Sequence, residues 1–252
     1  MYTDAVKWRG ISSDTAEQTQ PDKSLAERLL EVRAGIAQYV RPENQQINER
    51  SIEWLRASGI VERAQAAAND LSFRAKANAG EAERSPRSSD LLFSLPDQHG
   101  KFISVAELLS HGPLILSFFR GRWCPFCIAE LEAWRDALPQ VKAAGAALVT
   151  LSPQKVQHNA FTADQHKLTF PVLSDAGNQV AKQFGIVYRV PEEQEQLYRR
   201  SFVNLPHLNG DGSWELPLAA TFVVAPGGTI KSAFIQADYR ERAEPATVLA
   251  QL

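Results

Sequence analysis

Cysteine is scarce in this sequence: the chain has two, Cys124 and Cys127, three positions apart. A secreted scaffold held together by disulfides needs several cysteines spread along the chain, so the count argues against that class. A closed zinc site needs four ligands, and the five histidines show no paired spacing. We therefore expect neither a metal nor another cofactor. In a reducing compartment, an isolated Cys-x-x-Cys pair is typical of redox chemistry.

An excess of charge of one sign and long apolar runs are also missing. The 27 basic and 29 acidic residues give a formal net charge of −2, so we expect no broad attraction for nucleic acid or an anionic membrane. No run approaches the ~20 apolar residues of a membrane span. Residues 1–22 lack the features of a signal peptide. We expect a cytoplasmic protein whose partners are small molecules or proteins.

The N-terminal part of the chain has the pattern of helices. Apolar residues recur at three- and four-residue steps from Leu25 to Tyr39, and charged residues take the other face. Pro42 should break this helix, and a second helix is predicted to run through Ile60. Residues 80–89 are charged and poor in apolar side chains, which indicates a linker.

Strand and helix patterns alternate beyond residue 90. The continuous apolar run 114–119 predicts a buried central strand, 128–143 an amphipathic helix, and 146–151 a second buried strand. Together they form a βαβ unit. We therefore predict an α/β protein with a helical extension and linker over residues 1–89 and a main domain over 90–252. Further predicted elements are a hairpin around 96–100, a hairpin joining 221–225 to 230–234, a strand at 170–173, and helices at 105–110, 158–167, 178–185 and 244–252.

The two cysteines stand where a buried strand gives way to a helix. This position places both sulfurs near unpaired backbone amides and the positive end of the helix dipole, which favours the nucleophilic thiolate. Pro125 suits the first helical turn. The three-residue spacing puts both sulfurs on one side of that turn, close enough for a disulfide. The alternative is that the cysteines only fill space in the core.

Three neighbours of the pair are candidate site residues. Arg120 and Arg122 would add positive charge that favours the thiolate, and Trp123 would shield one face of the site. Each also has a simpler interpretation, because surface arginines are common near helix starts and tryptophan often serves packing.

Several separated pieces of the chain, in order, carry a resemblance to a known family. They are residues 114–127, 170–175 and 209–217, then Asp238-Tyr239-Arg240 with Glu244-Pro245. In these pieces the sequence resembles the peroxiredoxin-like proteins of the AhpC/TSA superfamily, over most of residues 91–252. The resemblance implies a thioredoxin-like fold, with a mixed central sheet flanked by helices and here an N-terminal helical extension. It also implies a homodimer.

The resemblance suggests residue roles as well. Typical members have a Pro-x-x-x-Thr-x-x-Cys signature whose cysteine attacks peroxide. Cys127 falls at that cysteine, Cys124 replaces the threonine, and Glu130 matches an acidic residue three positions later. In thioredoxin-like exchange proteins the first cysteine attacks instead, which would be Cys124, so both assignments stay open. An arginine usual in the family just before the strand at 221–224 is missing, with Ala219 there.

Three functions are compatible with these features. The favoured one is a thiol-dependent peroxidase that reduces hydrogen peroxide or organic hydroperoxides through the Cys-x-x-Cys pair. A thioredoxin-like or glutathione-type reductant would recycle it. The second is a thiol-disulfide oxidoreductase with little peroxidase activity, which the missing threonine and arginine favour. The third is a non-catalytic interaction module, which the intact cysteine pair disfavours.

Overall fold

The computed structural model describes residues 23–71 and 92–252. Residues 1–22 and the predicted linker at 80–89 lie outside this part of the chain. Helix α1 (Leu25–Tyr39) begins at a capping box in which the Ser24 side chain accepts a hydrogen bond from the Glu27 amide. Pro42 is the first residue of α2 (Pro42–Ala57). The second predicted helix is in fact two, because Gly59 adopts a left-handed φ of +66° before α3 (Ile60–Asp70).

The central sheet has five strands in the order β5-β4-β3-β8-β9. Strand β3 (Leu114–Phe118) pairs in parallel with β4 (Ala147–Ser152), and β4 pairs in parallel with β5 (Val172–Ser174). On the other side, β3 pairs antiparallel with β8 (Ala219–Val224), and β8 with β9 (Ile230–Gln236). The predicted mixed sheet is confirmed.

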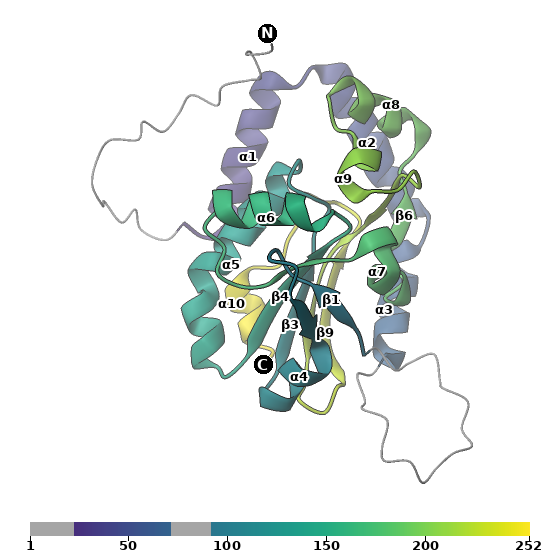
Figure 1. Ribbon diagram of the computed structural model, residues 1–252. Coiled ribbons are helices and arrows are strands. Elements are labelled where there is room, and N and C mark those ends of the chain that lie inside the picture. Colours follow the sequence, from purple (N-terminus) through teal and green to yellow (C-terminus); the bar gives the residue numbers. More distant parts are fainter. Residues whose placement is uncertain (1–22, 72–91) are drawn as a thin grey trace, which may run out of the picture.

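Helices cover both faces of the sheet (Figure 1). Helix α5 (Pro125–Ala143) lies on one face with α1 and α10 (Pro245–Leu249), and α3 and α7 (Gln179–Gln183) lie on the other. Because successive strand residues point to opposite faces, Leu116 and Phe118 join one hydrophobic core and Ile115 joins the other. The remaining elements up to α7 are β1 (Ser94–Pro96), β2 (Phe102–Ser104), α4 (Val105–His111), α6 (Val156–Gln165) and η1 (Ala176–Asn178).

The N-terminal helices are part of this packing. Leu25 and Leu29 of α1 are buried against α5, and burial of each such side chain stabilises by about 1.5–3 kcal/mol. The Glu244 carboxylate accepts hydrogen bonds from the amides of Leu25 (3.1 Å) and Ala26 (2.5 Å). Helix α1 is therefore fixed against the C-terminal segment as well as against α5.

The stretch between α7 and β8 holds elements that the sequence pattern did not predict. They are β6 (Val187–Arg189), α8 (Glu192–Arg200), α9 (Leu205–Asn209) and β7 (Glu215–Pro217). Within the described part of the chain, β6 and β7 pair only with each other. Each has three residues, too few for a clear alternation of apolar side chains. Helix α8 packs against α2 (Figure 1), where the Ser51 hydroxyl donates to the Gln194 side chain at 2.8 Å.

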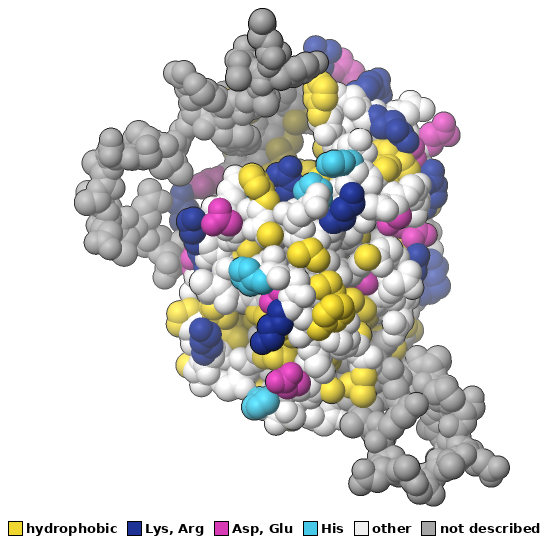
Figure 2. All heavy atoms as spheres, in the orientation of Figure 1, with side chains coloured by type: hydrophobic (Ala, Val, Ile, Leu, Met, Phe, Trp, Pro, Cys, Tyr) yellow, Lys and Arg dark blue, Asp and Glu magenta, His cyan; other side chains and the backbone are white. Residues whose placement is uncertain are grey.

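The described surface agrees with the nearly balanced charge of the chain. Figure 2 shows basic, acidic and hydrophobic side chains interspersed on one face. Among the described residues, no helix is long and apolar enough to cross a membrane.

Candidate active site

A tight turn between β3 and α5 positions the two cysteines. Cys124 is the N-cap residue of α5, and Pro125 is its first residue, as predicted. Within the turn, Gly121 has a φ of +144°, and a Cβ atom there would lie 2.6 Å from both the Gln154 Oε1 and the Trp123 Nε1 atoms. Only glycine fits this position without displacing its neighbours.

Cys127 is fully buried, and hydrogen-bond donors converge on its sulfur. The Arg242 Nη2 group donates to Cys127 Sγ at 3.3 Å, and the backbone amide of Arg120 donates at 3.5 Å. Arg242 also forms a buried ion pair with Glu130, one helical turn beyond Cys127. The Glu130 carboxylate therefore fixes the guanidinium that faces the sulfur.

These contacts separate the two thiols electrostatically. Burial opposes ionisation of Cys127, but the hydrogen bond from Cys124 and the positive charges of Arg242 and Arg120 outweigh it. They hold the pKa of Cys127 well below its ordinary value. For Cys124, burial and the hydrogen bond to Cys127 raise the pKa well above its ordinary value. The arrangement therefore favours the thiolate at Cys127 and the protonated thiol at Cys124.

Arg120 is an unusual buried cation. Its side chain is 1% exposed, its Nη2 group donates to the Tyr198 hydroxyl, and its guanidinium carbon lies 4.2 Å from the centre of the Tyr239 ring. The Arg120 Nε group has no hydrogen-bond partner, and no carboxylate in the described residues pairs with the guanidinium. With no carboxylate beside it, the positive charge of Arg120 is available to stabilise a thiolate of the cysteine pair or an anionic ligand.

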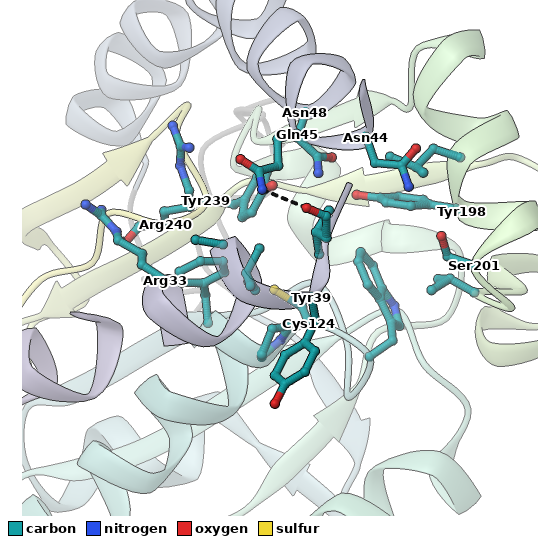
Figure 3. Close-up of a pocket in the computed structure, with 18 of the residues that line it drawn as sticks. Arg33, Tyr39, Asn44, Gln45, Asn48, Cys124, Tyr198, Ser201, Tyr239 and Arg240 are labelled. Carbon is teal, nitrogen blue, oxygen red and sulfur yellow. Dashed lines mark hydrogen bonds between the residues drawn. The ribbon is translucent and has the colours of Figure 1, made fainter. Parts of the chain in front are cut away.

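A cavity of about 630 Å³ opens onto Cys124. Its wall is built from the end of α1, the start of α2, α8 and the segment after β9 (Figure 3). Figure 3 shows Asn44, Gln45 and Asn48 of α2 across the cavity from Cys124. Cys127 is fully buried and does not line the cavity.

The structure brings together most of the candidates that the sequence suggested. Cys124, Cys127, Glu130 and Arg120 form one cluster, and Trp123 packs beside it with its ring 5.0 Å from that of Tyr198. Arg122 was predicted to add positive charge beside the thiolate. Its exposed guanidinium lies instead 4.8 Å from the centre of the Phe161 ring.

Sequence reasoning missed three functional candidates. They are Arg242 at the Cys127 sulfur, and Tyr198 and Tyr239 around Arg120. Arg242 is 115 residues from Cys127, but the family-like pieces at 238–240 and 244–245 bracket it and could have pointed to it. Tyr198 lies in α8, which the sequence pattern did not predict.

Within residues 23–71 and 92–252, no cluster of three or more histidine, cysteine, aspartate or glutamate side chains could hold a metal ion.

Comparison with known proteins identifies the family of this chain. The AhpC/TSA family model matches residues 90–233. A Mycobacterium tuberculosis protein assigned to the peroxiredoxins is 36% identical over 111 residues, 44% of this chain and 72% of that protein. The chloroplastic peroxiredoxin Q of Triticum aestivum is 36% identical over 95 residues, 37% of this chain and 43% of that protein. The crystal structure of the peroxidoxin BcpB from Mycobacterium tuberculosis superimposes with a TM-score of 0.50 at 25% identity, covering 64% of this chain and 91% of that chain.

The chain therefore belongs to the AhpC/TSA family. The predicted thioredoxin-like fold and the predicted class of enzyme, a thiol-dependent peroxidase, are confirmed.

Proposed function

We propose that Cys127 is the nucleophile that attacks the peroxide and that Cys124 is the thiol that resolves the product. The observation that supports this assignment is the convergence of the Arg242 guanidinium and the Arg120 amide on Cys127 Sγ. The thiolate is the reactive form of cysteine, and these donors stabilise it. Cys124 has the opposite environment, because it donates its proton toward Cys127.

In the proposed reaction, the two cysteines supply the two electrons that reduce the peroxide. The Cys127 thiolate attacks one peroxide oxygen, the O–O bond breaks, and the leaving hydroxide or alkoxide takes a proton to become water or an alcohol. Cys127 becomes a sulfenic acid. Cys124 then attacks the Cys127 sulfur, water leaves, and a Cys124–Cys127 disulfide forms. An external thiol reductant, of the thioredoxin or glutathione type, supplies the two electrons that restore both thiols.

Exchange of thiols and disulfides, with Cys124 attacking first, is the second candidate. One observation favours it: Cys124 lines the open cavity, and Cys127 does not. Against it stands the raised pKa of Cys124, since a protonated thiol is a poor nucleophile.

Serine variants of each cysteine separate the two candidates. In the Cys124→Ser variant, we expect peroxide to oxidise Cys127 to a sulfenic acid that dimedone traps and mass spectrometry detects. In the Cys127→Ser variant, we expect the rate of reaction with peroxide to fall by more than about a thousandfold. Stopped-flow tryptophan fluorescence measures the rates, with Trp123 beside the site. Fast oxidation of Cys124 in the Cys127→Ser variant would contradict the assignment.

The cellular setting belongs to the same proposal. A reducing cytoplasm suits a chain whose two cysteines both lie in the site. A homodimer is supported by the family resemblance and by large hydrophobic side chains exposed on α1 and α2, Leu30, Tyr39 and Trp54. Light scattering that gives the mass of a single chain would exclude the homodimer.

A further inference from the structure

The cavity in front of Cys124 is far larger than hydrogen peroxide requires. At about 630 Å³, it falls within the size range of pockets that bind small organic ligands. Much of its wall comes from α1 and α2, which lie outside the family match at 90–233. Both helices are fixed in place, since α1 is held by Glu244 and α2 by the buried Ser51–Gln194 hydrogen bond. The cavity is thus a built feature of this chain.

The position of the cavity connects it with one step of the catalytic cycle. A ligand in the cavity meets the sulfur of Cys124, whereas Cys127 is fully buried and does not line the cavity. In the proposed cycle, peroxide reacts with Cys127 and the reductant reacts with a disulfide. In that disulfide, Cys124 is the sulfur that faces the cavity. This position suits a ligand that reacts with the disulfide.

The described residues that line the cavity include four arginines and one carboxylate, Glu49, which is paired with Arg240, so the lining carries a net positive charge. Arg33 and Arg41 are exposed at its rim, and among the described residues no carboxylate forms an ion pair with either. Arg120, the buried cation without a carboxylate partner, lies at its floor. The α2 side chains Asn44, Gln45 and Asn48 add amide groups to the wall (Figure 3). Gln45 Nε2 donates to the Val40 carbonyl, and Asn48 Oδ1 accepts from Gln194, which leaves the Gln45 oxygen and the Asn48 NH₂ group for the amide and carboxylate groups of a short peptide.

We propose that this cavity binds a small anionic peptide thiol, of the glutathione class, which reduces the Cys124–Cys127 disulfide by attacking Cys124. This inference rests on the proposed function, because it requires that disulfide. Cys124 is only 2% exposed behind the wall of α1 and α2, so a small thiol reaches it more readily than the active site of a folded protein.

The proposed reduction exploits the different environments of Cys124 and Cys127. The peptide thiolate attacks Cys124 Sγ, the Cys124–Cys127 bond breaks, and its electron pair leaves on Cys127. A leaving thiol of low pKa departs faster, and Arg242 stabilises the departing thiolate. A second peptide thiolate then attacks the peptide sulfur of the mixed disulfide. The products are the oxidised peptide disulfide and Cys124, which takes up a proton.

Oxidation also favours anion binding in the cavity. In the reduced protein, the Cys127 thiolate balances part of the charge of Arg120, and in the disulfide that negative charge is gone. A ligand carboxylate can then interact with a guanidinium that has lost its counter-charge. The anionic thiol is expected to bind the oxidised protein more tightly than the reduced protein.

The test begins with protein that has been oxidised by one equivalent of hydrogen peroxide. Mass spectrometry establishes whether the disulfide has formed; if peroxide fails to form it, the proposed function fails, and diamide is used to make the disulfide for the next step. The oxidised protein is mixed with excess glutathione, 2-mercaptoethanol or cysteamine in a stopped-flow instrument. Rate constants are compared per thiolate, so that differences in thiol pKa do not contribute.

We expect the glutathione rate to saturate with concentration, to exceed the rates of the neutral and cationic thiols by about tenfold, and to fall as salt is added. In the Arg33→Gln/Arg41→Gln double variant, the ratio of the glutathione rate to the 2-mercaptoethanol rate should fall by about three- to tenfold. Arg200→Gln on α8 is the matched control, because Arg200 is exposed and does not line the cavity.

Two results would overturn the inference. One is a glutathione rate that rises linearly with concentration and is no faster per thiolate than that of 2-mercaptoethanol. The other is rapid reduction by thioredoxin while glutathione shows no saturation, which would assign the reducing step to a protein dithiol.

Discussion

The part of the chain that matches the AhpC/TSA family and the segments that flank it contribute different things to the site. Residues 90–233 contain both cysteines, Arg120 and Glu130. The flanking segments contribute Arg242, which contacts the Cys127 sulfur, and the α1 and α2 side chains that wall the cavity. The family fold therefore positions the two sulfur atoms. The flanking segments supply much of the positive charge near Cys127 and form much of the wall of the cavity that leads to Cys124.

The contribution of the flanking segments matters because the ionisation of a buried thiol depends on the charged groups around it. Burial alone disfavours the charged form of Cys127, and positive groups must overcome that cost. The Arg242 side chain is itself only 2% exposed and relies on Glu130 as its partner. The Cys127 thiolate, the Glu130 carboxylate and the guanidinium groups of Arg242 and Arg120 thus form one charge-balanced group that crosses the boundary between the two regions.

The largest expected effect on the reaction with hydrogen peroxide comes from removing the positive charge of Arg242, which lies in the flanking segment. In Arg242→Gln, the pKa of Cys127 should rise, so its thiolate becomes scarce at neutral pH. We expect the rate constant with hydrogen peroxide at pH 7 to fall by about ten- to a hundredfold and to recover as the pH is raised. In the wild type, the lowered pKa should keep the rate constant through neutral pH, with a decline only in more acidic solution. Stopped-flow pH profiles measure both.

A second variant separates this effect from damage to the fold. Arg242→Gln leaves Glu130 buried without its partner, which destabilises by about 3–5 kcal/mol. The double variant Arg242→Gln/Glu130→Gln removes both charges and should recover much of that stability while keeping the shifted pH profile. A profile with the wild-type midpoint in both variants would show that Arg242 does not control the ionisation of Cys127.

The sequence predicted the part of the site that is local in the chain. The apolar run at 114–119 followed by Cys-Pro-Phe-Cys indicated a strand, a turn and a helix start, and this local order places both sulfurs. Arg242 depends on how the segment after β9 folds back across α5, and no local periodicity encodes that path. The cavity was beyond prediction for the same reason, since it forms where α1, α2 and α8 meet.

An intermediate effect is expected inside the family-matched part, at the turn that carries Cys124. In Gly121→Ala, the added Cβ would lie 2.6 Å from Gln154 and Trp123, and the backbone would be strained at φ +144°. We expect the free energy of unfolding to fall by about 1–3 kcal/mol. Urea denaturation measures it. Gly227→Ala is the matched control, because no atom of the described residues lies within 4 Å of a Cβ built there. Equal stabilities of the two variants would show that the turn tolerates a side chain.

The smallest effect is expected for Arg122, although it lies only two residues from Cys124. Its guanidinium stacks on Phe161, and its link to the site is a backbone amide that donates to Gln154 Oε1 at 2.8 Å. Any residue except proline can donate that bond. We therefore expect Arg122→Gln to change the rate constant with hydrogen peroxide by less than about twofold, since exposed charges are well screened. A loss close to that of Arg242→Gln would mean that closeness in sequence, rather than contact with the sulfur, decides which arginine controls the thiolate.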